Sequence, residues 1–358
     1  MAGDDGTARI VAIGVFGLGS SLFALLLRVG GLAWVDGGKL YSGRLRSVFG
    51  GSLAWAWFVT ATILLLATFL VATPMLALRQ SQARSGYPSW SPASINFCEG
   101  PDFEHLPLVA EPVNTCSSLV CYCVPSLVGL LLQSGRGLAS RFRLTYLAIL
   151  LVGLGSAALH ASLLAVAQGG DELPMIYTVT MLAYCAVCDL FDRCPSRWEG
   201  VLKTGIPLVS ILATVAYCAL RDVFAFFGFF FLGYIIILCI WAKFQIAPPA
   251  SASVDDAELE VRRAIVVPNL IYGLTYVMLG CFCWSGEMGL CGAAEAGALG
   301  SWAPFVWRYW MHTGWHLFTG LAGFCAVQVQ IALAMRKTGA ISLDWALLPH
   351  VVVSPKTD

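Results

Sequence analysis

Long apolar runs are the feature that most constrains how this chain folds. A membrane-spanning helix needs roughly 20 predominantly apolar residues, and the 358-residue sequence contains nine candidate runs. Charged residues make up only 12% of the chain, about half the share in soluble domains. The sequence therefore predicts an all-α polytopic membrane protein. The runs lie near 10–28, 53–77, 113–132, 143–167, 174–191, 204–220, 223–242, 264–284 and 310–335.

The first run is interpreted as a retained span and not as a signal peptide, because the acidic Asp4 and Asp5 precede it where a signal peptide has basic residues. A long polar stretch at 78–110 follows the second run. We therefore expect an N-terminal extension with two helices (1–90), a seven-helix bundle (91–338) and a tail (339–358). The formal net charge is zero, so nothing indicates a nucleic-acid partner.

The charged residues predict how the chain is oriented in the bilayer. Lys and Arg gather in alternate segments, and such segments prefer the cytoplasmic side. The opposite segments are acidic, as at Glu99, Asp171 and Glu287. We expect a luminal N-terminus, a cytosolic C-terminus and an odd number of spans, which charge alone cannot fix at seven or nine. The basic segments are 29–52, 133–142, 192–203, 243–263 and the stretch after 335.

Three of the five histidines lie in predicted spans. His312 and His316 are four residues apart, so they share a helix face. His160 lies in another run, four residues after Ser156, at a similar predicted depth. Three histidines with one open position form a catalytic zinc arrangement. Hydrogen bonding between helices and heme ligation remain alternative interpretations.

Acidic residues border the same end of the predicted bundle. Asp171 and Glu172 precede Pro174 and an apolar run, which is typical of an ordinary helix start. Beside a metal, such a carboxylate could instead act as a general base. Glu111 precedes Pro112 and has the same two interpretations, as a first-turn acid or a functional group.

The loops on that side hold oxygen ligands and two cysteines. The stretch from Asn96 to Asp102 is rich in oxygens, as a calcium site requires, or is simply a solvated polar loop. Cys98 and Cys291 lie in the two long luminal loops, and in an oxidising lumen they could pair.

Three sequence blocks together resemble the alkaline ceramidase family, seven-helix membrane amidases related to adiponectin receptors. Ser156-x-x-x-His160 is followed by Asp171-Glu-Leu-Pro-Met, and His312-x-x-Trp-His316 lies in the last run. Asn96-Phe-Cys-Glu99, followed by Glu111 and Asn114-Thr115, resembles the family's entry segment. The resemblance covers roughly 94–336 and leaves the first 90 residues unexplained.

The resemblance implies a role for each matching residue. His160, His312 and His316 would bind zinc, Asp171 would act as the base, and Ser156 would stabilise the oxyanion. Cys98 would pair with Cys291. The sequence departs from the family where Asn96 replaces an aspartate, where Leu159 replaces a phenylalanine, and where one extra residue precedes Glu111. A calcium site would use Asn96, Phe97, Glu99, Asp102 and Glu111, with Asp102 preferred to Pro101 for its carboxylate.

The resemblance predicts a zinc-dependent amidase that cleaves ceramide to a sphingoid base and a fatty acid in the endoplasmic reticulum or Golgi membrane. Zn²⁺ is the expected cofactor, with Ca²⁺ as a second metal, and a ceramide-type lipid and the bilayer are the expected partners. Three alternatives remain open: a related membrane lipid hydrolase, an adiponectin-receptor-like receptor with structural zinc, and a heme-binding or transport protein.

Overall fold

The computed structural model describes residues 93–95, 97–100, 109–132, 139–193, 197, 199–220, 224–246, 256–335, 339–345 and 349–355. The two helices expected within residues 1–90 lie outside these ranges. A helix covers each of the seven segments expected for the bundle.

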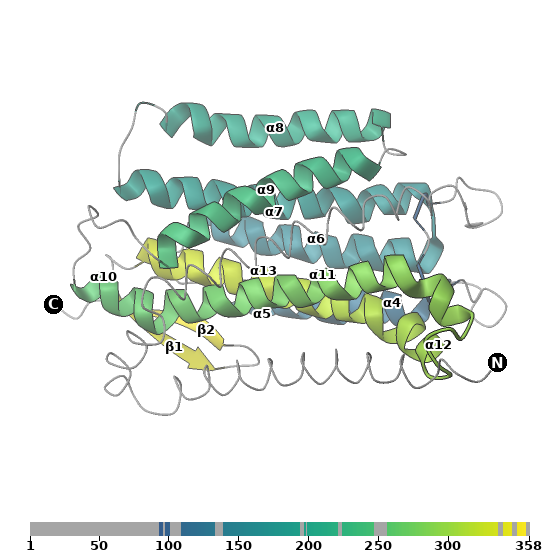
Figure 1. Cartoon of the computed structure of the whole chain (residues 1–358). Coiled ribbons are helices and arrows are strands. Elements are labelled where there is room, and N and C mark those ends of the chain that lie inside the picture. Colours follow the sequence, from purple (N-terminus) through teal and green to yellow (C-terminus); the bar gives the residue numbers. More distant parts are fainter. Residues whose placement is uncertain are drawn as a thin grey trace.

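Long helices that run side by side form the body of the protein (Figure 1). Six stretches of the described residues are helical and apolar enough to cross a membrane, so this is an integral membrane protein. Helix α9 adds a shorter apolar stretch, 233–245. The elements are α4 (Pro112–Ser118), η1 (Leu119–Cys123), α5 (Val124–Leu132), α6 (Ser140–Ser162), α7 (Ala165–Arg193), α8 (Glu199–Leu220), α9 (Phe224–Ile246), α10 (Asp256–Val261), η2 (Arg262–Val266), α11 (Val267–Glu295), α12 (Ala303–Val306), η3 (Trp307–Met311) and α13 (His312–Met335), where η denotes a π-helical segment.

Helices α6, α7, α11 and α13 form the centre of the bundle, where α6 packs along α7 and α11 along α13. The core between them includes Tyr146, Ile149 and Phe324. Helix α8 lies on the outside (Figure 1), and its apolar side chains are mostly exposed, as at Ile211 and Val215. An exposed apolar face of this kind suits contact with lipid tails.

Several predicted helix ends differ from the structure. Helix α7 begins at Ala165, so Asp171 and Glu172 lie inside a helix, and their interpretation as an ordinary helix start is wrong. Pro174 lies within this helix, where a membrane protein can satisfy the backbone groups that proline leaves free. Helix α11 continues to Glu295, through the first part of the loop expected at 285–309. Hydropathy marks only the part of a helix that crosses the bilayer, and the helix can continue beyond the apolar run.

The end of the chain forms a β-hairpin that the all-helical prediction missed. Strand β1 (Gly339–Trp345) pairs antiparallel with β2 (Pro349–Pro355), and Gly339 lies opposite Pro355. The backbone N–H of Val351 donates to Gln328 of α13 at 2.7 Å. The hairpin therefore packs against the bundle, at the end opposite α12 (Figure 1).

Candidate metal centre

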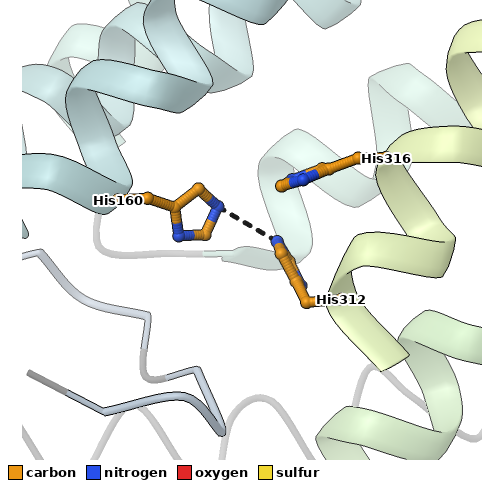
Figure 2. A group of neighbouring side chains, drawn as sticks. All are labelled: His160, His312 and His316. Carbon is orange, nitrogen blue, oxygen red and sulfur yellow. Dashed lines mark hydrogen bonds between the residues drawn. The ribbon is translucent and has the colours of Figure 1, made fainter. Parts of the chain in front are cut away.

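His160, His312 and His316 lie together in the bundle, and all three are buried. His160 is near the end of α6 and points across to the two histidines at the start of α13 (Figure 2). Their ligand nitrogens all lie within 4.8 Å of one another. The Nε2 atoms of His160 and His312 are 3.1 Å apart.

The second nitrogen of each ring contacts a buried polar group. His160 Nδ1 lies 2.7 Å from Glu111 Oε2, and His312 Nδ1 lies 2.5 Å from Glu287 Oε2. His316 Nδ1 lies 2.8 Å from Ser117 Oγ. A histidine that donates from Nδ1 to a carboxylate keeps the Nε2 lone pair for a metal. Neither Glu287 nor Ser117 belongs to a motif in the sequence.

These nitrogens fit a zinc ion. Two ligands of one tetrahedral zinc, each at about 2.0–2.1 Å, lie roughly 3.3 Å apart, close to the 3.1 Å between the Nε2 atoms of His160 and His312. Carboxylates bonded to ligand histidines are a common feature of zinc sites. Zinc nevertheless remains a prediction for this chain.

The segment before α4 fixes the end of helix α6, where His160 lies. The last carbonyls of a helix have no partner within it. Here the carbonyl of His160 accepts from Glu111 N at 3.0 Å, and that of Ala161 from Ala110 N at 2.8 Å. The carbonyl of Leu163 accepts from Ala93 N at 2.8 Å. Glu111 thus contacts the ring and the backbone of His160.

Ser156 and Asp171 line one pocket together with His312 and His316. Ser156 Oγ lies 3.4 Å from His316 Nε2 and 3.1 Å from Ser118 Oγ. The structure therefore brings the predicted base and the predicted oxyanion-stabilising hydroxyl to the histidine cluster. The spacing of the sequence motifs anticipated this grouping.

A second, larger pocket adjoins the first along the bundle. Its cavity volume is about 170 Å³, and its lining is almost entirely apolar. Both pockets are lined by Tyr122, Met175, Phe231 and Trp315. The larger pocket follows α13 from Trp315 as far as Gln330. Its shape and lining suit a long hydrocarbon chain.

The acids predicted to bind calcium have protein partners in the structure. Glu99 accepts from the backbone N–H groups of Val113 and Asn114, both at 2.8 Å, and so caps helix α4. Burial raises the pKa of the Glu99 carboxyl to about 7, although these two N–H groups oppose the shift. Asn96 and Asp102 lie outside the described residues, so calcium remains a prediction.

Cys98 and Cys291 form a disulfide, as the resemblance implied. This bond joins the segment around Phe97 to helix α11. The Phe97 ring lies 4.5 Å from both the His160 and the His312 rings, measured between centroids. Cys98 N also donates to Glu287 Oε1 at 2.9 Å. The disulfide segment is therefore packed directly against the histidine cluster.

The fold and this site define an integral membrane protein with a buried polar centre among long apolar helices. Comparison with known proteins places the chain more narrowly. The family model described as Ceramidase matches residues 90–352, so the chain belongs to this family. The polar centre lies within the matched range.

Individual relatives agree with the family match. The chain is 24% identical over 281 residues to "Putative alkaline ceramidase dcd3A" of Dictyostelium discoideum, covering 70% of this chain and 89% of that protein. It is 21% identical to "Alkaline ceramidase" of Arabidopsis thaliana, covering 75% and 96%. It is 36% identical to "Alkaline ceramidase 3" of Mus musculus over a shorter stretch, 28% of this chain and 38% of that protein.

Proposed function

We propose that this protein is a zinc-dependent amidase that hydrolyses the N-acyl amide of ceramide within the membrane, releasing a sphingoid base and a fatty acid. The observation that supports this most strongly is the convergence of three buried histidines beside Ser156 and Asp171. Two proteins that the chain resembles are named "Putative alkaline ceramidase dcd3A" and "Alkaline ceramidase".

The side chains of the polar centre have distinct roles in this reaction. His160, His312 and His316 would hold zinc, which when bound would supply Lewis acidity for amide cleavage. Asp171 accepts the proton of the attacking water and returns it to the departing amine. Ser156 donates a hydrogen bond to the oxygen that becomes negative as the carbonyl is attacked. Water is consumed, and one amine and one carboxylic acid are formed.

The larger pocket would hold a hydrocarbon chain of the substrate. Its apolar lining begins beside Trp315, next to the histidines, and continues along α13. Because lipid tails are about as apolar as this lining, the chain could leave the bilayer at little cost in free energy, and the pocket would hold the amide at the polar centre.

We also propose that α9 is the seventh span of the bundle and that the histidine cluster faces the lumen of the endoplasmic reticulum or Golgi. Basic residues lie at the opposite helix ends, as at Arg141, Lys203 and Arg263, and such residues prefer the cytosol. Disulfides persist in an oxidising lumen, which agrees with the position of Cys98 and Cys291.

Hydrolysis of a fluorescent ceramide by the purified protein tests the proposal directly. We expect fatty acid release from the natural sequence and a loss of at least about 100-fold in His312→Gln, because removing a ligand should exceed the effect of removing an outer partner. Zinc content measured by mass spectrometry on the same samples should fall in parallel.

His350→Gln provides the matched control, because His350 lies in the β-hairpin and not in the cluster. We expect its activity and zinc content to equal those of the natural sequence. Full ceramide turnover by His312→Gln would refute the assigned site. Zinc binding without any fatty acid release would favour the receptor alternative.

A further inference from the structure

Glu172 is a second carboxylate in the polar pocket, and the proposed mechanism does not use it. It follows Asp171 in helix α7, lines the same pocket as His312 and is only 4% exposed. An ionisable side chain inside a membrane-spanning helix is costly and usually has a function. Its position therefore requires an explanation.

Two hydrogen bonds hold the Glu172 carboxylate in place. The Tyr217 hydroxyl of α8 donates to Oε2 at 2.6 Å, and Gln168 Nε2 donates to Oε1 at 2.9 Å. Gln168 is itself fixed by Ser94, whose backbone N–H donates to Oε1 of Gln168 at 2.8 Å. A carboxylate can accept hydrogen bonds at about four positions. The two bonds from Tyr217 and Gln168 therefore orient the Glu172 carboxylate and leave it able to accept further hydrogen bonds.

The location of this acceptor suits a hydroxyl group next to the amide. Consecutive residues of a helix project about 100° apart, so Glu172 lies to the side of Asp171 and not behind it. In a ceramide, the carbon that bears the amide nitrogen lies between two carbons that carry hydroxyls. A ceramide with its amide at Ser156 and Asp171 would thus present a hydroxyl group, as a hydrogen-bond donor, to one side of the polar centre.

We propose that Glu172 determines substrate specificity by accepting a hydrogen bond from the primary hydroxyl of the sphingoid base, held in orientation by Tyr217 and Gln168. This inference rests on the proposed ceramide hydrolysis. The pocket should therefore prefer amide lipids that have a free hydroxymethyl group beside the amide to amide lipids that have a methyl group at that position.

Two substrates that differ only in this hydroxyl provide the test. We would measure kcat/KM for a fluorescent N-acyl sphingosine and for its 1-deoxy counterpart in the same vesicles. A hydrogen bond to a charged acceptor corresponds to about 10- to 100-fold in kcat/KM, so the natural sequence should prefer the hydroxylated lipid by that factor. In Glu172→Gln we expect the hydroxylated substrate to lose most of this advantage while turnover of the 1-deoxy lipid changes by less than about threefold.

Tyr217→Phe and Glu199→Gln make the result decisive. Tyr217→Phe retains the Glu172 carboxylate but removes one of the two groups that orient it. It should therefore lower the preference for the hydroxylated substrate by only part of its value. If Glu172→Gln does not fold, Tyr217→Phe tests the inference in its place. Glu199 is a carboxylate of α8 paired with Lys203 outside the pocket, so Glu199→Gln should leave the ratio unchanged.

Equal losses on both substrates, or an unchanged ratio in the folded variants, would overturn the inference. Absence of turnover in the natural sequence would instead refute the proposed function.

Discussion

Glu287 connects the histidine cluster to the disulfide segment through both oxygens of its carboxylate. Oε2 lies 2.5 Å from His312 Nδ1, and Oε1 accepts from Cys98 N at 2.9 Å. The side chain is fully buried. Because outer partners orient ligand histidines and raise their basicity, their removal commonly costs 10- to 100-fold in metal affinity.

We therefore expect Glu287→Gln to bind zinc about 10- to 100-fold more weakly than the natural sequence. Titration against a chelator of known affinity, with zinc measured by mass spectrometry, would give the difference. Glu295→Gln is the control, because Glu295 lies on the same helix but is exposed. Equal zinc affinity in Glu287→Gln and Glu295→Gln would show that Glu287 does not orient a ligand.

Sequence reasoning found the members of the site that belong to motifs and missed those that depend on contacts across the fold. His312 and His316 share a helix face by their spacing alone. Glu287 contacts a histidine 25 positions away, and Ser117 contacts one 199 positions away, so neither pairing follows from periodicity. One available signal was that Glu287 precedes Cys291 by four residues, which places it on the face of the expected disulfide.

The backbones of helices α6 and α7 are in close contact beside the residues proposed to act on the substrate. A Cβ atom added to Gly155 would overlap the backbone carbonyl oxygen of Gly170. These glycines immediately precede Ser156 and Asp171. Pro174 has no N–H to donate to the carbonyl of residue 170, which leaves this carbonyl free to face α6. Glycine at 155 thus sets the distance between the hydroxyl and the carboxylate.

Gly155→Ala should force these two helices apart. Overpacking costs about 1–3 kcal/mol, more than the gain of up to about 1 kcal/mol from placing alanine in a helix. We expect a lower melting temperature in detergent and a strong loss of ceramide hydrolysis. Gly205→Ala on α8 is the control, because its added Cβ would meet nothing within 4 Å. A variant Gly155→Ala as stable and active as Gly205→Ala would contradict this view of the contact.

The helix ends show why sequence alone located the elements but not their limits. Each apolar run between residues 113 and 335 corresponds to a helix in the described part of the chain, because a helix inside a membrane needs an apolar surface toward the lipid or the core. The polar string before Pro174 was interpreted as a helix start, yet α7 begins nine residues earlier, at Ala165. The hairpin β1–β2 was not predicted either, because its contacts with α13, such as the bond from Val351 to Gln328, join residues that no sequence pattern connects.

At the scale of the whole molecule, the polar centre lies at one end of the bundle and the hairpin at the other (Figure 1). The disulfide, Phe97 and the histidines are at the α12 end, and the basic residues Arg141, Arg143 and Lys203 are at the far end. This separation agrees with a luminal site and a cytosolic tail.

The disulfide should stabilise both the fold and the metal centre. Cys98 and Cys291 are 193 positions apart in sequence, and native disulfides commonly contribute about 2–4 kcal/mol. The double variant Cys98→Ala/Cys291→Ala should therefore melt at a lower temperature. It should also lose zinc more readily, because the segment that holds the Phe97 ring 4.5 Å from His160 and His312 is no longer tied to α11. Cys116→Ala, at an exposed cysteine of α4, should change neither property. If the double variant matched Cys116→Ala in melting temperature and zinc retention, the disulfide would be a passive feature of the fold and not a support of the site.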